Sequence, residues 1–233
     1  MTAPSPLSLV ARLRGLSTSA LSDVLDHCGY REQSIASAIA PLDRAAKLAG
    51  VAACLEGVSE DSEGRAPALP SFEIDRRMAE GAVLVIAMNG HRASAAVGGL
   101  MCLAARRRGC AGFVVDGGVR DAPEIVELAM PTFCRYVTPL NSGGRWHLTR
   151  ADAEIALPGQ SAPRVMVSPG DFLIGDGDGL IAIPRSIAEQ VIAWTEQLAE
   201  IEQAIARRIE AGASREEAFA EHPRFRHIGR LKD

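Results

Sequence analysis

Apolar runs separated by glycines and polar turns divide the middle of the chain into short alternating segments. Residues 83–88 form a continuous apolar run with β-branched side chains, typical of a strand covered on both faces. The apolar and then basic segment 100–108 predicts a helix that ends at Gly109. Residues 113–115 predict a second buried strand, and Pro123 predicts the start of another helix. This series of alternating strands and helices indicates parallel pairing with right-handed crossovers.

The two ends of the chain have helical patterns. Hydroxyl residues at 17–19 offer N-caps to a short helix over 20–26, and Gly29 provides its end. Residues 187–209, with mixed Glu and Arg, predict a long helix. The tail, 213–233, is expected to pack on a neighbouring subunit or to stay mobile.

The segments that flank the central series are shorter. Residues 56–70 are polar and contain Pro and Gly, which predicts a mobile surface loop, and 72–79 predict a helix. Residues 165–167, 172–174 and 180–183 predict short strands. Gly, Pro and Asp turns separate these strands, so an antiparallel arrangement is expected.

Composition and charge restrict the class of protein. With 233 residues, 47% hydrophobic and 23% charged, the chain is long enough for one large globular domain or two small ones. A net charge of −4 argues against nucleic acid and anionic membranes as main partners. The longest apolar stretch, 82–88, is too short to span a bilayer, and no secretory signal is evident. Five scattered cysteines are interpreted as small core residues, so a cytoplasmic protein is expected.

The first candidate binding feature is the segment Gly98, Gly99, Leu100 and Met101, at the start of a predicted helix. The amides of a first helical turn lack partners within the helix and lie at the positive end of its dipole. They therefore suit a carboxylate or a phosphate. The alternative is a tight turn that needs two glycines for its backbone and binds no ligand.

The second candidate is the segment 116–121, DGGVRD, interpreted as a loop after the second buried strand. Arg120 is a planar bidentate donor for a carboxylate or enolate oxygen, and Asp121 is a hard oxygen ligand for Mg²⁺ or Mn²⁺. A plain surface ion pair is the alternative. Glycines that let the backbone approach a ligand favour the binding interpretation, as do two candidates at the carboxyl ends of adjacent parallel strands.

Other chemistries are disfavoured by spacing. Residues 176–179, DGDG, do not fit a calcium loop, because the first and twelfth ligand positions would be Ile174 and Arg185. No P-loop or complete dinucleotide fingerprint occurs, and the five histidines show no metal-ligand spacing. Lys47 and Lys232 lie away from both candidate segments in sequence, which disfavours Schiff-base and pyridoxal chemistry.

A series of motifs spans roughly residues 15 to 185, and its members are 22–26, 98–100, Gly109, Gly112, 114–121, 131–133, 168–171 and 176–179. The DG-x-x-RD block within 114–121 is the most specific of them. This series resembles the RraA-like family. That family includes divalent-metal aldolases for 4-hydroxy-4-methyl-2-oxoglutarate and 4-carboxy-4-hydroxy-2-oxoadipate, and regulators of ribonuclease activity. The resemblance implies an α/β/β/α sandwich over 1–185. It also implies a C-terminal helix and tail, 186–233, that packs on a neighbouring subunit of a trimer or hexamer with shared sites.

The resemblance also implies roles for the candidate residues. The amides of Gly98 to Met101 would hold the substrate carboxylate, and Arg120 would bind the keto or enolate oxygen. Asp121 would hold Mg²⁺ or Mn²⁺, and Glu124 would support the loop. A neighbouring subunit would add an acid from its C-terminal helix, and three positions remain open for it: Glu196, Glu200 and Glu202.

Position 99 departs from the pattern of the active aldolases, which carry an acid where this chain has Gly99. Regulatory members resemble the chain more closely there. The favoured function is a metal-dependent lyase that cleaves small α-keto acids through a pyruvate enolate, as an aldolase or an oxaloacetate decarboxylase. Decarboxylation is the less affected reaction, because it needs no base at a C4 hydroxyl. The rivals are a regulator that inhibits a ribonuclease by protein contact and an α-keto-acid protein with another chemistry.

Overall fold

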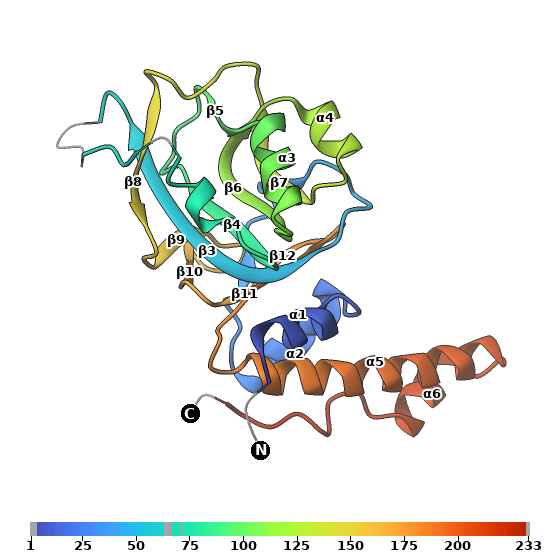
Figure 1. The fold of residues 1–233 in the computed structure, drawn as a ribbon. Helices are drawn as coiled ribbons and strands as arrows, with labels where there is room; N and C mark the ends of the chain where they lie inside the picture. The colour runs from blue at the N-terminus through green and yellow to red at the C-terminus, as the bar shows by residue number, and fades with distance from the viewer. Residues whose placement is uncertain (1–3, 63–66, 71, 232–233) are drawn as a thin grey trace.

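A computed structural model describes residues 4–62, 67–70 and 72–231 as a mixed α/β fold (Figure 1). The helices are α1 (Pro6–Leu13), α2 (Thr18–Cys28), α3 (Gly99–Arg107), α4 (Ala122–Glu127), α5 (Ala188–Glu210) and α6 (Arg215–Glu221), with a 3₁₀ turn η1 (Asp75–Arg77). The strands are β1 (Ser34–Ile35), β2 (Ala40–Pro41), β3 (Leu48–Ser59), β4 (Ala82–Ala87), β5 (Ala95–Val97), β6 (Gly112–Val119), β7 (Thr132–Val137), β8 (Trp146–Ala151), β9 (Ile155–Pro158), β10 (Arg164–Val167), β11 (Phe172–Asp176) and β12 (Gly179–Ile183).

The sheet has a parallel centre and antiparallel flanks. Strands β3, β4, β6 and β7 are parallel neighbours, as the alternating pattern predicted. On the other side of β3 the order is β11, β12 and β1, each antiparallel to its neighbour. At the opposite edge of the sheet, β2 pairs antiparallel with β7. Strand β5 pairs with β6, β8 pairs with β3, and β9 and β10 form a separate two-stranded sheet. The antiparallel pairing predicted for the C-terminal strands is confirmed.

Strand β3 is twelve residues long and belongs to both parts of the sheet. Residues 48–51 pair with β11, and residues 55–59 pair with β8. The prediction of a loop that begins at Glu56 is therefore wrong for residues 56–59. These residues continue strand β3, with a register shift between Glu56 and Gly57. Glycine and acidic residues in this stretch misled the prediction, because strand pairing outweighed their low β-propensity.

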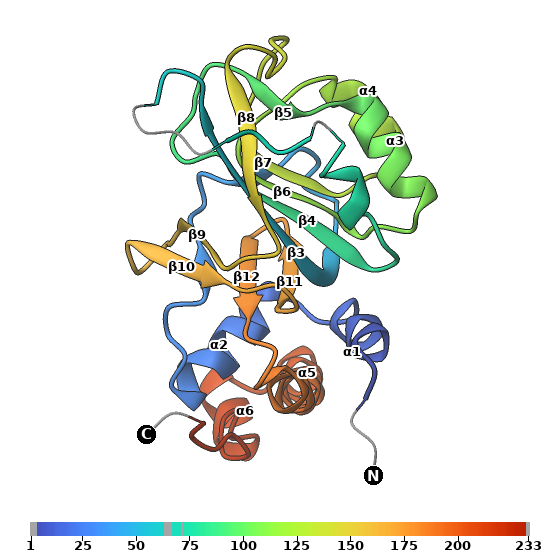
Figure 2. The ribbon, with the colours of Figure 1, turned by 60° about the vertical axis from the view of Figure 1, so that its left-hand side comes forward.

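Three apolar cores separate four layers. Helices α3 and α4 cover one outer face, and α1, α2 and α5 cover the other (Figures 1 and 2). In β4, Leu84 and Ile86 pack in the core that includes Cys102 and Ile125 from α3 and α4. The intervening Val83 and Val85 pack in the core between the β layers. The predicted α/β/β/α sandwich is thus confirmed, and each face of β4 meets a different layer.

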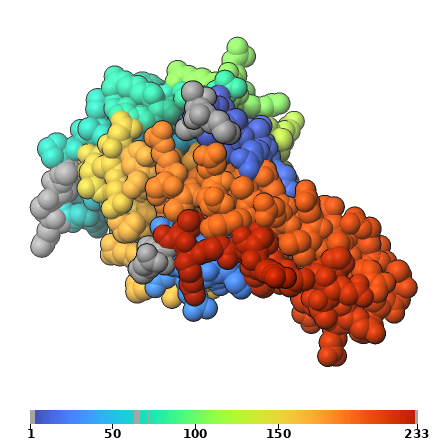
Figure 3. Space-filling view, turned by 90° about the horizontal axis from the view of Figure 1, so that it is seen from below, coloured from blue at the N-terminus to red at the C-terminus, as the bar shows by residue number. Residues whose placement is uncertain are grey.

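The C-terminal helix shares a core with the rest of its own chain. Val191 and Ile192 of α5 belong to the same apolar cluster as Leu13 and Leu21. The outer part of α5, with α6 beside it, extends past the rest of the molecule (Figure 3). The described tail is ordered against its own chain, where the Phe225 ring stacks on His27 with centroids 3.8 Å apart. Contact with a neighbouring subunit stays a prediction.

Two helical predictions need correction. The helix expected over 72–79 is only the turn η1, because Ile74 and Met78 are the buried positions of this stretch and span a single turn. Helix α1 was not predicted, although Ser5 caps it and Pro6 occupies its first turn. The five cysteines are free, and four of them are buried, as expected for core residues. None of the helices described here combines the length and the apolar composition of a membrane-spanning segment.

Candidate functional site

The two candidate segments meet where β5 and β6 end. These strands are parallel, with Ala95 opposite Gly118 and Val97 opposite Val119. The Arg120 N–H continues the pairing by donating to the Val97 carbonyl at 2.9 Å. Strand β5 was not predicted, because three residues are too short to give a periodic signal. It is nevertheless the strand that places the start of α3 beside the end of β6.

Asp121 holds the two segments together. Its backbone is left-handed, with φ 59° and ψ 38°, a conformation that Asp tolerates better than most residues. Asp121 occupies the N-cap position of α4 but does not cap that helix with its side chain. Its Oδ2 instead accepts the Gly99 N–H at 3.0 Å and lies 3.5 Å from Arg120 Nε. The carboxylate thus caps α3, a helix from a different part of the chain.

This contact changes the predicted anion site. The Gly99 amide already binds Asp121, so it is not available to a substrate carboxylate. The amides of Leu100 and Met101 belong to the same first turn, where N–H groups have no acceptor within the helix. An anion at the start of α3 would therefore meet the amides of Leu100 and Met101 rather than the Gly99 amide.

A cavity of about 260 Å³ lies in front of this turn. It is lined by Gly98, Leu100, Met101 and Arg120, and by Asn141 and Ser142 from the loop between β7 and β8. Asn141 and Ser142 were not predicted, because polar side chains in a Ser/Gly-rich loop have no distinctive pattern. The Ala95 N–H holds this loop over β5 by donating to the Leu140 carbonyl at 2.8 Å.

The glycines of the DGGVRD segment have a different role from the predicted one. Strand β6 runs through Val119, so residues 116–119 are not a loop. A Cβ atom on Gly117 would overlap the Met88 side chain, and one on Gly118 would overlap the Tyr136 ring. These two glycines permit packing against protein neighbours, and the interpretation that they let a ligand approach is wrong.

Gly98 and Gly99, in contrast, lie directly under the charged side chains of the second segment. A Cβ atom on Gly98 would be 2.9 Å from Asp121 Oδ2 and 3.0 Å from Arg120 Nε. One on Gly99 would overlap Glu124 Oε2. A side chain at position 98 or 99 would therefore displace these charged side chains from the start of α3.

Asp116, the first residue of the segment, faces away from this site. It is 7% exposed and forms an ion pair with Arg135 of β7. Burial raises the pKa of the Asp116 carboxyl, and the hydrogen bond from Arg135 offsets part of that rise. A separate cavity of about 330 Å³, lined partly by Asn89 and Arg164, opens at this pair.

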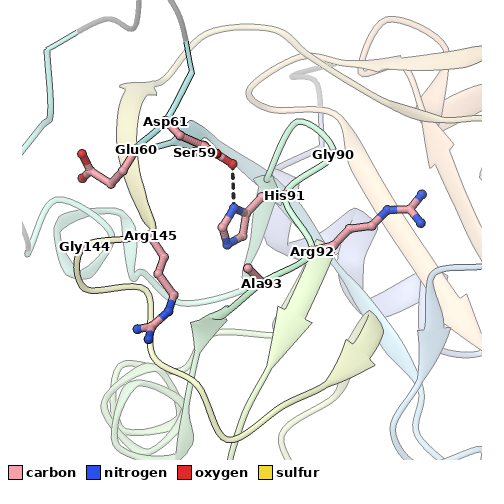
Figure 4. A pocket seen from close by; sticks show the side chains of 9 residues that line it. All are labelled: Ser59, Glu60, Asp61, Gly90, His91, Arg92, Ala93, Gly144 and Arg145. Carbon is pink, nitrogen blue, oxygen red and sulfur yellow. Dashed lines mark hydrogen bonds between the residues drawn. The ribbon is translucent and has the colours of Figure 1, made fainter.

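A larger cavity, of about 500 Å³, lies on a different part of the surface (Figure 4). His91 stands at its wall, with Nδ1 2.7 Å from Ser59 Oγ and Nε2 2.7 Å from Ser94 Oγ. Burial lowers the pKa of His91, so the ring is neutral at pH 7 and joins the two hydroxyls as donor and acceptor. None of the predicted site residues lines this cavity, so its size does not make it the better candidate.

Asp121 is compatible with a hard divalent cation. Its side chain is 36% exposed, and both of the contacts described above are made by Oδ2 rather than Oδ1. Mg²⁺ commonly binds through one or two carboxylates and keeps several waters. Within the described residues, no group of three or more His, Cys, Asp or Glu side chains is placed to bind a metal. A cation here would therefore rely on Asp121, water and substrate oxygens.

The three candidate acids of the C-terminal helix have different surroundings. Glu196 accepts two hydrogen bonds from Arg12, at 2.8 and 2.6 Å. Glu202 forms an ion pair with Arg224 of the tail. Glu200 is exposed on the same helix. Two of the candidates are thus engaged within their own chain.

The fold and this site define a class: a mixed α/β protein in which a helix start lies beside an Arg–Asp pair at the ends of parallel strands. The chain belongs to the RraA-like (Aldolase/RraA) family, whose model matches residues 18–182.

Individual relatives support this assignment. A putative 4-hydroxy-4-methyl-2-oxoglutarate aldolase of Halalkalibacterium halodurans is 28% identical over 186 residues, 80% of this chain and 81% of the relative. Protein DlpA of Legionella pneumophila is 28% identical over 91% of this chain, which spans only 33% of DlpA. RraAS2 of Streptomyces coelicolor, described as an unusual member of the RNase ES inhibitor RraA family, superposes with a TM-score of 0.72 at 26% identity. That match covers 87% of this chain and 97% of RraAS2.

Proposed function

We propose that the protein is a divalent-metal-dependent lyase that cleaves a carbon–carbon bond of small α-keto acids and releases pyruvate. The observation that carries this proposal is the convergence of Asp121, Arg120 and the first turn of α3. Asp121 Oδ2 lies 3.0 Å from the Gly99 nitrogen and 3.5 Å from Arg120 Nε. Arg120 and the first turn of α3 thus line one cavity, and the Asp121 carboxylate contacts both of them. The aldolase name of the H. halodurans relative agrees with this chemistry.

Each group has a defined task in this proposal. The amides of Leu100 and Met101 bind the C1 carboxylate of the substrate at the positive end of α3. Arg120 donates hydrogen bonds to the C2 oxygen and stabilises the negative charge that develops there as the enolate forms. Asp121 keeps the guanidinium in place and would hold Mg²⁺ or Mn²⁺. When bound, such a cation supplies Lewis-acid polarisation of the α-keto acid group.

A substrate panel tests this function. Pyruvate release is measured from 4-hydroxy-4-methyl-2-oxoglutarate and from oxaloacetate, with Mg²⁺, with Mn²⁺, and with EDTA. We expect release with either metal, loss with EDTA, and recovery when Mg²⁺ is added in excess. Turnover that is equal in EDTA would overturn the metal assignment, and no turnover of either substrate in any metal would overturn the lyase assignment.

One observation favours a second candidate function. Gly99 provides no side chain at the position where the active aldolases carry an acid, and the similar RraAS2 belongs to a family named for ribonuclease inhibition. A regulator of this kind would act through its surface. It would inhibit a ribonuclease equally well before and after Asp121→Ala. This alternative would be excluded if the unmodified protein did not inhibit the ribonuclease, or if inhibition were lost in Asp121→Ala.

We also propose that the protein is a homotrimer or hexamer in which α5 approaches a neighbour's site. Because Glu196 and Glu202 are engaged by Arg12 and Arg224, Glu200 is the favoured acid to cross the interface. Light scattering at micromolar concentration should give a trimeric or hexameric mass. A monomeric mass with full activity would exclude a shared site.

A further inference from the structure

A histidine and two serines form a chain of hydrogen bonds at the wall of the 500 Å³ cavity (Figure 4). His91 Nδ1 lies 2.7 Å from Ser59 Oγ, and Nε2 lies 2.7 Å from Ser94 Oγ. His91 and Ser94 are buried, whereas Ser59 is half-buried and lines the cavity. The end of the chain that faces the cavity is therefore a serine hydroxyl, with an imidazole ring directly behind it.

The turn after β4 places His91 against the end of β3. Asn89 and Gly90 both have left-handed backbones, with φ 50° and 79°, and they reverse the chain directly before His91. The Tyr136 hydroxyl holds the other side of the turn, because it lies 3.2 Å from the His91 carbonyl oxygen and 3.1 Å from that of Ser94. The imidazole is therefore fixed in its place before any ligand binds, which is the arrangement that a catalytic base needs.

The protonation of His91 suits a base. Burial lowers the pKa of the ring, so it is neutral at pH 7 and can accept a proton. When Nε2 carries the proton of the neutral ring, it donates to Ser94 Oγ, and the Ser59 hydroxyl donates to Nδ1. The negative charge of Asp61, which lines the same cavity, favours the protonated ring that would form during a reaction. A hydroxyl, a base and a group that orients the base are the elements that activate a serine nucleophile.

The same cavity offers a cation for a developing oxyanion. Arg145 lines the cavity, and its printed hydrogen bonds, to the carbonyl oxygens of Asn141 and Gly143, are long at 3.4 and 3.5 Å. Its guanidinium can exchange these weak bonds for a shorter, charge-assisted bond to an oxyanion. The other arginine of the cavity, Arg92, points away from the imidazole ring (Figure 4). Arg145 is therefore the favoured group to stabilise negative charge beside Ser59.

We propose that this cavity is a second active site, in which Ser59 and His91 hydrolyse small carboxylic esters. Ser59 Oγ forms a bond to the acyl carbon while its proton passes to His91 Nδ1, and the carbonyl electron pair moves to the oxygen. When this tetrahedral species collapses, the bond to the alcohol oxygen breaks and that oxygen takes the proton from His91. Water then attacks the acyl-serine, with His91 again taking and returning one proton. The products are a carboxylic acid and an alcohol, and Ser59 is regenerated.

A fluorophosphonate tests the nucleophile in the unmodified protein. Ser59 Oγ should displace fluoride from phosphorus, and peptide mass spectrometry should find the adduct on Ser59. Hydrolysis of 4-nitrophenyl acetate should stop once the adduct has formed. In Ser59→Ala both reactions should fall to the rate measured without protein. Ser62→Ala, which removes an exposed serine of the next turn, is the matched control and should keep both. An unlabelled protein, or an adduct on another residue, would overturn the proposal.

Two further variants test the base and the residue that positions it. His91→Gln should lower kcat for the ester by about 10²–10⁴-fold, the usual contribution of general acid–base catalysis. Ser94→Ala should lower kcat and leave KM unchanged, because Ser94 orients the ring without contacting the ester. Equal ester hydrolysis by His91→Gln would contradict the role of the base.

The ester reaction is independent of the proposed lyase function, because the predicted lyase residues do not line this cavity. Ester hydrolysis should therefore be unchanged by EDTA and in Asp121→Ala, and pyruvate release should be unchanged in Ser59→Ala. Loss of ester hydrolysis in Asp121→Ala would show that the two reactions share one site and would overturn the second one. An unmodified protein that releases pyruvate but hydrolyses no ester would refute the ester proposal alone.

Discussion

The base of the molecule, formed by α1, α2 and α5, and the candidate site are stabilised by different kinds of contact. In the base, α1, α2 and α5 bury large apolar side chains completely, among them Leu13, Leu21 and Leu198. At the site, Arg120 and Asp121 remain 40% and 36% exposed, and a few contacts with the backbone of residues 97–99 set their positions. Burial of apolar surface stabilises the base, whereas short contacts between two chain segments position the charged groups of the site.

This difference predicts that stability and activity can be changed separately. Removing apolar atoms from the base costs transfer free energy and leaves a cavity, whereas Arg120 and Asp121 lie on other elements and should keep their positions. Removing a charged group from the exposed site costs little burial, yet it removes a group that is proposed to bind the metal or the substrate. Four substitutions test how far this separation holds.

The largest effect is expected from Asp121→Ala. Metal-dependent pyruvate release should fall by more than about 10²-fold, the upper range for losing a group that only supports a metal ligand. The midpoint of thermal unfolding should fall only modestly: the side chain is partly exposed, but its loss removes the cap of α3 and leaves alanine in a left-handed backbone. Asp178→Ala, which removes another exposed aspartate, is the control and should keep full activity. Normal turnover of Asp121→Ala in Mg²⁺ would show that the metal is bound elsewhere or is not required.

Leu198→Ala tests the opposite region. Leu198 is fully buried on α5, so its truncation should lower the free energy of unfolding by about 2–5 kcal/mol, measured in urea. The KM for substrate, measured well below the unfolding transition, should stay unchanged. A large change in KM without loss of stability would show that the base and the site are coupled.

Gly118→Ala tests whether β6 behaves as core or as site. A Cβ atom there would overlap the Tyr136 ring and lie 2.7 Å from the Ser94 carbonyl oxygen. Overpacking of this kind costs about 1–3 kcal/mol of unfolding free energy. The control is Gly15→Ala, whose new methyl group would meet only the Arg12 carbonyl oxygen, at 3.6 Å. Equal stability of the two variants would contradict the packing role of Gly118.

The smallest effect is expected from Glu196→Gln. The hydrogen bonds from Arg12 hold the pKa of Glu196 below its usual value, so the folded state favours the charged carboxylate. This contribution is present above the unfolded pKa and is lost as pH falls through the folded pKa. Since both side chains are over one third exposed, it should be under about 1 kcal/mol. Urea unfolding of both proteins at pH 7 and in acid should show the difference only at pH 7.

The sequence predicted the parts of the fold that have a strong period. The run at 83–88 and the helix over 187–209 were recognisable because burial on one or all sides imposes a regular apolar spacing. Strand β5 and helix α1 were missed because each is short. Segment 116–119 was taken for a loop because its glycines, which serve packing against Met88 and Tyr136, resemble turn residues.

The sequence indicated which residues belong to the site but not how they contact one another. The residues at 98–101 and 120–121 were found from the chemistry of helix starts and charged pairs, and the structure brings them together. The bond from the Gly99 amide to Asp121 and the position of Glu124 over Gly99 could not be predicted. Both depend on the left-handed backbone of Asp121, which sets the direction of α4 and which no local pattern specifies.

Strand β3 also has a consequence for how the chain folds. Its first residues pair with β11, more than one hundred positions later, and its last residues pair with β8. Neither β layer can be completed before these distant segments arrive, so neither can serve as an independent folding unit. Contacts between residues far apart in sequence slow the search for the native state. The two layers should therefore unfold together in one cooperative transition, because both depend on the pairing of β3.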